Sequence, residues 1–106
     1  MQYGLTDKQL NEILDIITAN PAVEEAILFG SRAKGNYRKG SDVDIALKGE
    51  NLTLTDVLHI DNQLDDTYLP YTFDIILYRH INDPDVIEHI NRVGIDILKK
   101  AEIQHE

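Results

Sequence analysis

The sequence predicts an α/β (α+β) fold, because stretches with the apolar period of a helix alternate with short apolar runs typical of strands. The apolar runs lie at residues 23–29, 43–47 and 73–77 and contain mainly Ile, Leu, Val, Ala and Phe. The stretches between them carry the start and stop signals of helices. With 106 residues, we expect one domain with a single modest core, spanning residues 1–106.

The first helix is expected to begin after Thr6. Thr6 and Gln9 resemble a capping box, in which each side chain accepts a hydrogen bond from the backbone N–H of the other residue. The apolar residues that follow at helical spacing are Leu10, Ile13, Leu14 and Ile17. Asn20-Pro21 then ends the run.

Two more helices are expected in the second half of the chain. The first of them spans about residues 53–66, and its side chains expected to face inward are Leu54, Val57, Leu58, Ile60 and Leu64. Asp83-Pro84 starts the next helix and Gly94 caps it. Residues 95–98 alternate like a short edge strand, and the tail over 99–106 is expected to be frayed.

A small-residue turn follows the apolar run at residues 23–29. Gly30 lacks a Cβ and allows a tight turn, and Ser31 then opens a short helix that Gly35 ends. Backbone N–H groups at this helix start, together with the Ser31 hydroxyl, form a site suited to a phosphate group. Gly30 and Ser31 are therefore candidate nucleotide-binding residues.

Four cations follow this turn in an otherwise acidic chain: Arg32, Lys34, Arg38 and Lys39. Their loop is expected to meet phosphates, so Arg32 is a further candidate nucleotide-binding residue. For Arg38 and Lys39, a solvated surface position is an equally good interpretation.

The segment Asp42-Val43-Asp44 supplies two carboxylates. The two-residue period of a strand places Asp42 and Asp44 on one face and the apolar residues on the other. Carboxylate oxygens are hard ligands that suit Mg²⁺ or Mn²⁺. Asp74 is the candidate third ligand, because it interrupts an apolar strand where a carboxylate is costly to bury unless paired or metal-bound.

Each of these features also has a simpler interpretation. Asp83-Pro84-Asp85 shows that an acidic chain contains such pairs by chance, and a Gly-Ser after a strand is usually an ordinary turn. An edge-strand Asp that faces water would look the same as Asp74 in the sequence. The ordered combination of strand, turn, basic loop, paired acids and later acid is much rarer than any one part, and it favours nucleotidyl transfer.

Residues 27–35 (ILFGSRAKG) and 41–47 (SDVDIAL) closely resemble the minimal nucleotidyltransferase (MNT) family of the DNA polymerase beta-like superfamily. The resemblance implies a mixed sheet flanked by helices, ATP as donor, and two divalent ions, Mg²⁺ or Mn²⁺. It assigns the triphosphate to Gly30 and Ser31, and the metals to Asp42, Asp44 and Asp74 as catalytic residues. Lys34 departs from the family pattern, because many relatives carry Arg there.

Small members of this family resemble antitoxins that silence a HEPN-domain ribonuclease by adenylylating a tyrosine. The resemblance therefore implies a toxin-antitoxin role, in which AMP is transferred from ATP to a hydroxyl of a helical HEPN-type partner. Two alternatives stay open at this stage. One is a non-catalytic nucleotide-binding subunit that neutralises its partner by docking, and the other is a small-molecule transferase that resembles the aminoglycoside nucleotidyltransferases.

Composition limits the partners. A net charge of −9 makes nucleic acid an unexpected acceptor, because phosphate neutralisation needs a basic surface. The chain has no Cys, no long apolar run and no signal-like start, so we expect a cytoplasmic protein without membrane contact. We assign no chemistry to the four histidines, which show no metal-ligand spacing: His59, His80, His89 and His105.

Overall fold

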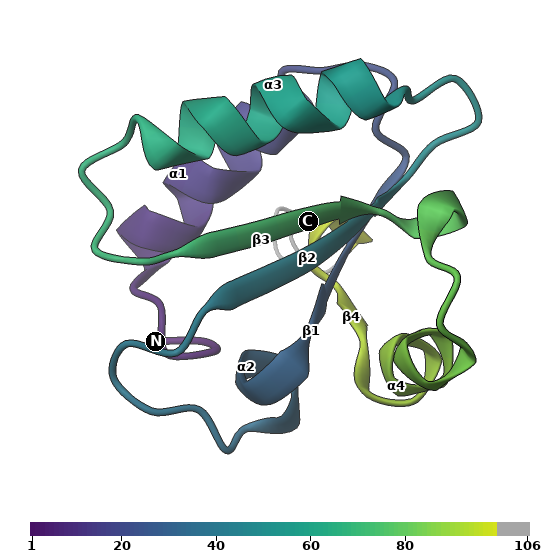
Figure 1. Cartoon of the computed structure of the whole chain (residues 1–106). Helices are drawn as coiled ribbons and strands as arrows, with labels where there is room; N and C mark the ends of the chain where they lie inside the picture. Colours follow the sequence, from purple (N-terminus) through teal and green to yellow (C-terminus); the bar gives the residue numbers. More distant parts are fainter. Residues whose placement is uncertain (100–106) are drawn as a thin grey trace.

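A four-stranded mixed sheet forms the middle of the molecule, in a computed structural model that describes residues 1–99 (Figure 1). In chain order the elements are α1 (Asp7–Thr18), β1 (Glu25–Phe29), α2 (Gly30–Lys34), β2 (Val43–Lys48), α3 (Leu54–Asp65), β3 (Phe73–Leu77), a 3₁₀ turn (Tyr78–His80), α4 (Pro84–Val93) and β4 (Ile95–Asp96). The strand order is β3-β2-β1-β4. β2 and β3 are parallel, whereas β1 is antiparallel to both β2 and β4. The predicted α/β fold with a mixed sheet is confirmed.

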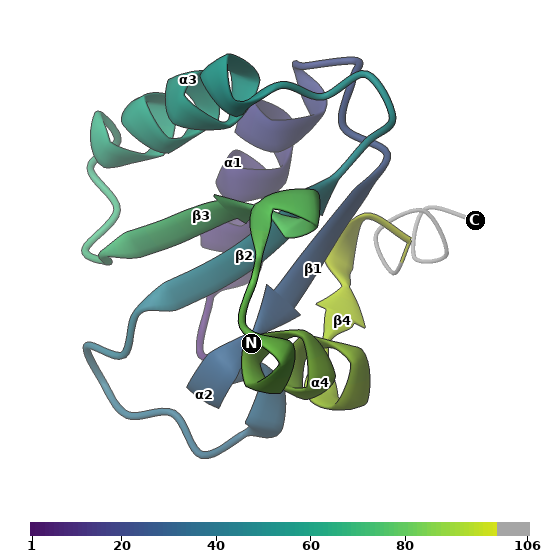
Figure 2. The same ribbon diagram turned by 45° about the vertical axis from the view of Figure 1, so that its right-hand side comes forward.

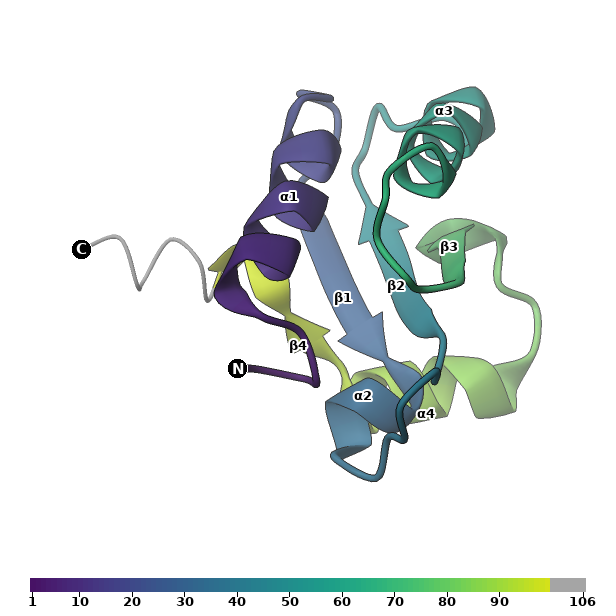
Figure 3. The same cartoon turned by 90° about the vertical axis from the view of Figure 1, so that its left-hand side faces the viewer.

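Helices cover the two faces of this sheet differently. α1 and α3 lie together on one face, while α2 and α4 lie on the other side (Figures 1 and 3). The turned view shows that α4 crosses near β1 and β4 (Figure 2). The alternation of β2 explains the division, because Val43, Ile45 and Leu47 belong to the main core with α1 and α3. Ala46 belongs to a smaller core with Ile90 of α4.

The predicted helix starts are confirmed in detail. Thr6 Oγ1 accepts from the N–H of Gln9 at 3.1 Å, and the N–H of Thr6 donates to Gln9 Oε1 at 3.0 Å. Thr53 and Asp56 form a second capping box at the start of α3. Because these starts are fixed by residues three apart, local sequence is enough to locate them.

Two predictions about the elements are wrong. Leu54 and Leu58 were expected to face inward, but they are 49% and 52% exposed, whereas Val57, Ile60 and Leu64 of the same helix are buried. The last strand was expected to cover residues 95–98, yet β4 ends at Asp96. The Asp96 carboxylate accepts hydrogen bonds from the N–H groups of Leu98 and Lys99, which turns the chain out of the strand.

Of the tail predicted to be frayed, residues 100–106 lie outside the described residues. Within residues 1–99, none of the helices combines the length and the apolar character that a membrane span requires.

Candidate active site

The turn between β1 and α2 brings Gly30 against Asp44. Gly30 has a φ of +74°, a conformation that side chains other than Gly rarely adopt, and a Cβ built there would overlap the Asp44 carboxylate. The pairing of β1 with β2 causes this approach, because Phe29 lies opposite Asp44. Gly30 is therefore required both by its backbone conformation and by the space that Asp44 takes.

The three predicted carboxylates gather beside this turn. Asp44 and Asp74 are register partners on the parallel strands β2 and β3, so their side chains leave the same face of the sheet. Asp42 precedes Asp44 by two residues and belongs to that face as well. This face is opposite to the one that α1 and α3 cover, and it opens beside the Gly30 turn.

The charges of these carboxylates act on one another. The pKa of Asp44 is raised to about 6, first by burial and then by the negative charges of Asp74 and Asp42, while Arg32 opposes the rise. A carboxylate in this position is therefore stabilised by any cation that reaches it.

The reason given for Asp74 was wrong, although its place in the cluster is as expected. β3 is an edge strand and the Asp74 side chain is exposed, so burial does not force it to be paired. It joins the cluster because of its register with Asp44. The sequence alone does not reveal the register between β2 and β3, so it could not show that Asp74 lies beside Asp44.

The raised pKa of Asp44 predicts a pH-dependent stability. A carboxyl group with a pKa of about 6 in the folded state and about 4 when unfolded favours folding below pH 4, and this contribution is lost as the pH rises to about 6. We expect Asp44→Asn to raise the melting temperature of the metal-free protein by a few degrees more at pH 7 than at pH 4. Thermal unfolding in a chelator, with the exposed Asp15→Asn as control, measures this; equal differences at both pH values would contradict it.

Arg32 is buried, with 2% of its surface exposed. Its Nη1 donates to the carbonyl of Tyr3 at 2.9 Å, and its Nε and Nη2 donate to the carbonyl of Ser41 at 3.2 and 2.8 Å. The rings of Tyr37 and Tyr71 lie 5.5 and 4.8 Å from the guanidinium carbon. Arg32 thus joins α2 to the N-terminal turn and to the loop before Asp42, and its contact with a nucleotide stays a prediction.

Replacing Arg32 is expected to destabilise the protein. Arg32→Met would leave the carbonyl groups of Tyr3 and Ser41 without their donors, which costs about 3 kcal/mol of the free energy of unfolding. Arg38→Met, at an exposed position in the same loop, is the matched control and should change stability by less than about 0.5 kcal/mol. Urea unfolding measures both; equal stability of the two variants would exclude this anchoring role.

His89 reaches the turn from α4, although the sequence pointed to no chemistry for it. Its Nε2 accepts a hydrogen bond from the N–H of Gly30 at 3.1 Å, and its ring packs edge-on against Phe29. The only signal in the sequence was the position of His89 on the same helix face as Val86 and Ile90, which does not distinguish packing from function.

The sequence matches the family described as polymerase beta, nucleotidyltransferase, over residues 11–103. The chain belongs to this nucleotidyltransferase family. None of the curated proteins compared with it matches significantly.

Solved structures with the same nucleotidyltransferase fold include MNT-type proteins. A chain of a toxin-antitoxin complex with AMP-PNP has a TM-score of 0.68 and 22% identity, covering 82% of this chain and 70% of that one. A protein described as a minimal nucleotidyltransferase has a TM-score of 0.67 and 26% identity, covering 90% and 95%. A chain of the complex between a tri-AMPylated Shewanella oneidensis HEPN toxin and its MNT antitoxin has a TM-score of 0.61 and 18% identity, covering 89% and 75%. The resemblance drawn from the sequence is confirmed.

The donor set of this nucleotidyltransferase suits a hard divalent cation, because three carboxylates leave one face and repel one another without a cation. Within residues 1–99, however, no three acidic or His side chains already converge on a single metal position. Asp42 and Asp74 are both exposed, so the fold leaves their side chains room to turn toward Asp44.

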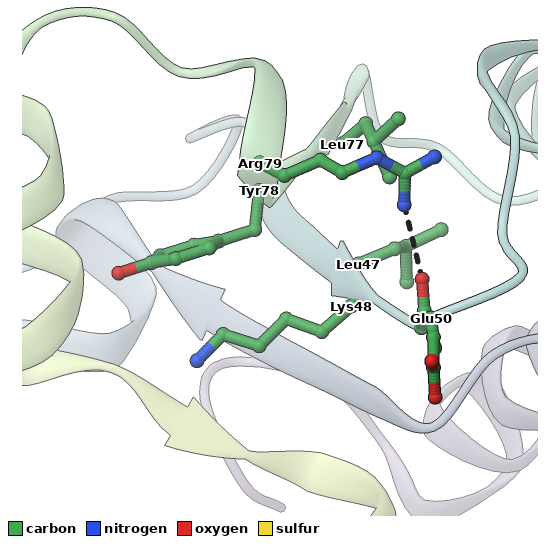
Figure 4. Close-up of a pocket in the computed structure, with 7 residues that line it drawn as sticks. Leu47, Lys48, Glu50, Leu77, Tyr78 and Arg79 are labelled. Carbon is green, nitrogen blue, oxygen red and sulfur yellow. Dashed lines mark hydrogen bonds between the residues drawn. The ribbon is translucent and has the colours of Figure 1, made fainter.

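A pocket of about 380 Å³ lies at the other end of β2 and β3 (Figure 4). Lys48 extends along Tyr78, with its Nζ 4.2 Å from the ring centroid, and Arg79 donates to the carbonyl of Gly49 at 3.0 Å. Because Asp42 and Asp44 stand at the start of β2 and Lys48 at its end, this pocket is separate from the carboxylates.

Proposed function

We propose that this nucleotidyltransferase transfers AMP from ATP to a hydroxyl group of a protein partner, and that it is an antitoxin that adenylylates a HEPN ribonuclease toxin. The placement of Asp44 between the Gly30 turn and Asp74 carries the chemical part of the proposal. The partner is suggested by the structural neighbour that contains an AMPylated HEPN toxin with its MNT antitoxin.

In this proposal Asp42, Asp44 and Asp74 hold two divalent ions. Bound Mg²⁺ or Mn²⁺ would supply positive charge that stabilises the triphosphate oxygens and acidifies the attacking hydroxyl. The N–H groups at the start of α2 and the Ser31 hydroxyl bind the triphosphate. Because His89 occupies the N–H of Gly30, the donors that remain for a phosphate begin at Ser31.

The reaction is an in-line displacement at the α-phosphorus of ATP. The acceptor oxygen forms a bond to this phosphorus, the bond to the β-phosphate bridging oxygen breaks, and pyrophosphate leaves. The proton of the acceptor hydroxyl passes to a carboxylate or to water. The chain contributes by holding the donor at the turn and by presenting negative charge for the ions.

Exposure of the carboxylates favours a large acceptor. Asp42 and Asp74 are both exposed, and Asp44 lies only partly covered between them. A hydroxyl on the surface of another folded protein can therefore approach this face without a deep pocket. A docking role alone would not require the close fit of Gly30 and Asp44.

Intact mass measurement tests the proposal. The chain is co-expressed with a helical HEPN-type protein, and the two proteins are incubated with Mg²⁺ and ATP. We expect the partner to gain one or more AMP units with the wild-type chain and none with Asp42→Asn/Asp44→Asn. Asp15→Asn, which changes an exposed carboxylate of α1, should behave as wild type.

The opposite results are equally informative. A stable complex whose partner gains no mass would contradict AMP transfer to protein and support neutralisation by docking. Mass gain that persists in Asp42→Asn/Asp44→Asn would remove the carboxylates from the mechanism.

A further inference from the structure

β3 leaves one side of its backbone without a neighbouring strand. It stands at the end of the order β3-β2-β1-β4, so among residues 1–99 only β2 pairs with it. The N–H of Val43 donates to the carbonyl of Thr72, which sets the ladder so that Asp74 and Ile76 direct their backbone groups toward β2. The N–H and carbonyl groups of Ile75 therefore point outward, where a further strand could pair with them.

An apolar groove of about 330 Å³ runs between α3 and this free edge. Figures 1 and 3 show α3 and β3 side by side at the same side of the molecule. The groove is lined by Leu54, Val57, Leu58, Ile75, Ile76, Leu77, His80 and Ile81. Leu54 and Leu58, each about half exposed, give α3 an apolar surface that the fold itself does not cover.

The same stripe of α3 becomes acidic toward its C-terminal end. Asp61 and Asp65 follow Leu54 and Leu58 at spacings of three and four residues, so they lie on one side of the helix. Asp61 Oδ1 is shielded from solvent and has no hydrogen-bond partner among the described residues. Burial, followed by the charges of Asp65 and Asp74, raises the pKa of Asp61. Among residues 1–99, no cationic side chain forms an ion pair with Asp61 or Asp65.

The acidic charge of the chain argues against a second copy of the chain as the occupant of the groove. Two copies paired through β3 would bring these acidic ends together, and each chain carries a net charge of −9. A basic segment from a different protein is complementary to the same surface.

We propose that the groove between α3 and β3 binds an extended segment of the acceptor protein, which adds a strand to β3, places alternate apolar side chains against Leu54 and Leu58, and pairs a Lys or Arg with Asp61 and Asp65. The assignment of this segment to the acceptor protein rests on the proposed function. The binding mode rests on the free strand edge, the groove and its charge.

This docking connects the groove to the chemistry. A strand paired with β3 runs past Asp74, which belongs to the same strand and lies beside Asp44. The partner is therefore held along the edge from which its hydroxyl must approach the carboxylates. Recognition and reaction share β3 but use different side chains.

Selection from a phage-displayed library of random dodecapeptides, with the full chain as bait, tests the proposal. We expect the enriched peptides to alternate apolar and other residues and to carry a Lys or Arg toward one end. In fluorescence anisotropy, Leu58→Glu and Asp61→Lys should each weaken binding by about tenfold or more. The exposed positions Tyr68→Glu and Glu88→Lys supply controls matched in charge change, and they should bind as wild type.

The backbone part of the proposal has its own measurement. N-methylation of the peptide amides that face β3 should weaken binding about tenfold, whereas methylation of the alternate amides should not. Absence of enriched peptides, enrichment of acidic peptides, or equal binding by the two methylated forms would overturn the proposal. So would unchanged affinity in Leu58→Glu.

These assays contain no ATP and therefore separate docking from transfer. Asp42→Asn/Asp44→Asn should bind the peptides as wild type does. If that binding persists while no partner gains AMP, the docking groove stands and the proposed reaction fails. If Leu58→Glu transfers AMP to a partner at the wild-type rate, the reaction stands and the docking groove fails.

Discussion

Asp44→Asn is expected to lower AMP transfer by about a thousandfold or more. Asp44 is the most buried of the three carboxylates and the one that Gly30 and Asp74 both approach, so its replacement removes the central carboxylate of the proposed metal site. Asn keeps the size of the side chain and removes its charge. The rate is measured as AMP incorporated into the co-expressed partner under saturating ATP and Mg²⁺.

The control for this result is folding. The variant should keep the wild-type circular dichroism spectrum, and in metal-free buffer at neutral pH it should be no less stable, because it no longer bears the cost of a buried negative charge. Loss of activity together with a gain of stability would show that the charge of Asp44 serves catalysis and not folding. Transfer within about threefold of wild type would exclude a metal-holding role for Asp44.

Gly30→Ala is the second substitution expected to have a large effect. The added Cβ meets the Asp44 carboxylate, and the φ of +74° is unfavourable for Ala. Since the carboxylate is a movable side chain, we expect it to swing away. The loss should be about 2 kcal/mol in the free energy of unfolding and about a hundredfold in transfer rate.

Gly35→Ala separates the two causes. Gly35 also has a positive φ, +89°, but a Cβ there meets nothing within 4 Å. It should therefore lose about 1 kcal/mol of stability, from backbone strain alone, and keep most of its activity. Equal activity of Gly30→Ala and Gly35→Ala would show that the fit between Gly30 and Asp44 does not matter for transfer.

Local signals in the sequence predicted the parts of the fold that depend on residues close in the chain. The capping box at Thr6, the strand that ends at Gly30 and the alternation around Asp44 all follow from spacings of two to four residues. Such spacings do not depend on the tertiary structure, so they can be recognised in the sequence.

Features that depend on neighbours far along the chain could not be predicted. Apolar spacing does not tell whether a helix lies over the middle or the edge of a sheet, so Leu58 was expected to be buried. The contact between Gly30 and His89 joins residues 59 apart in the sequence and has no local signature. Arg32 was predicted to bind the nucleotide, and its burial was not foreseen because its two carbonyl partners and two aromatic neighbours come from separate segments.

The mixed sheet also has a consequence for the order in which the parts of the site form during folding. β1, α2 and β2 are consecutive, so the Gly30 turn and Asp44 can come together through a short loop closure. Asp74 reaches them only after α3 has crossed over to make β3 parallel to β2, and such non-local pairings form slowly. We therefore expect the electrostatic repulsion between Asp44 and Asp74 to arise late in folding, after the hairpin of β1 and β2 has already formed.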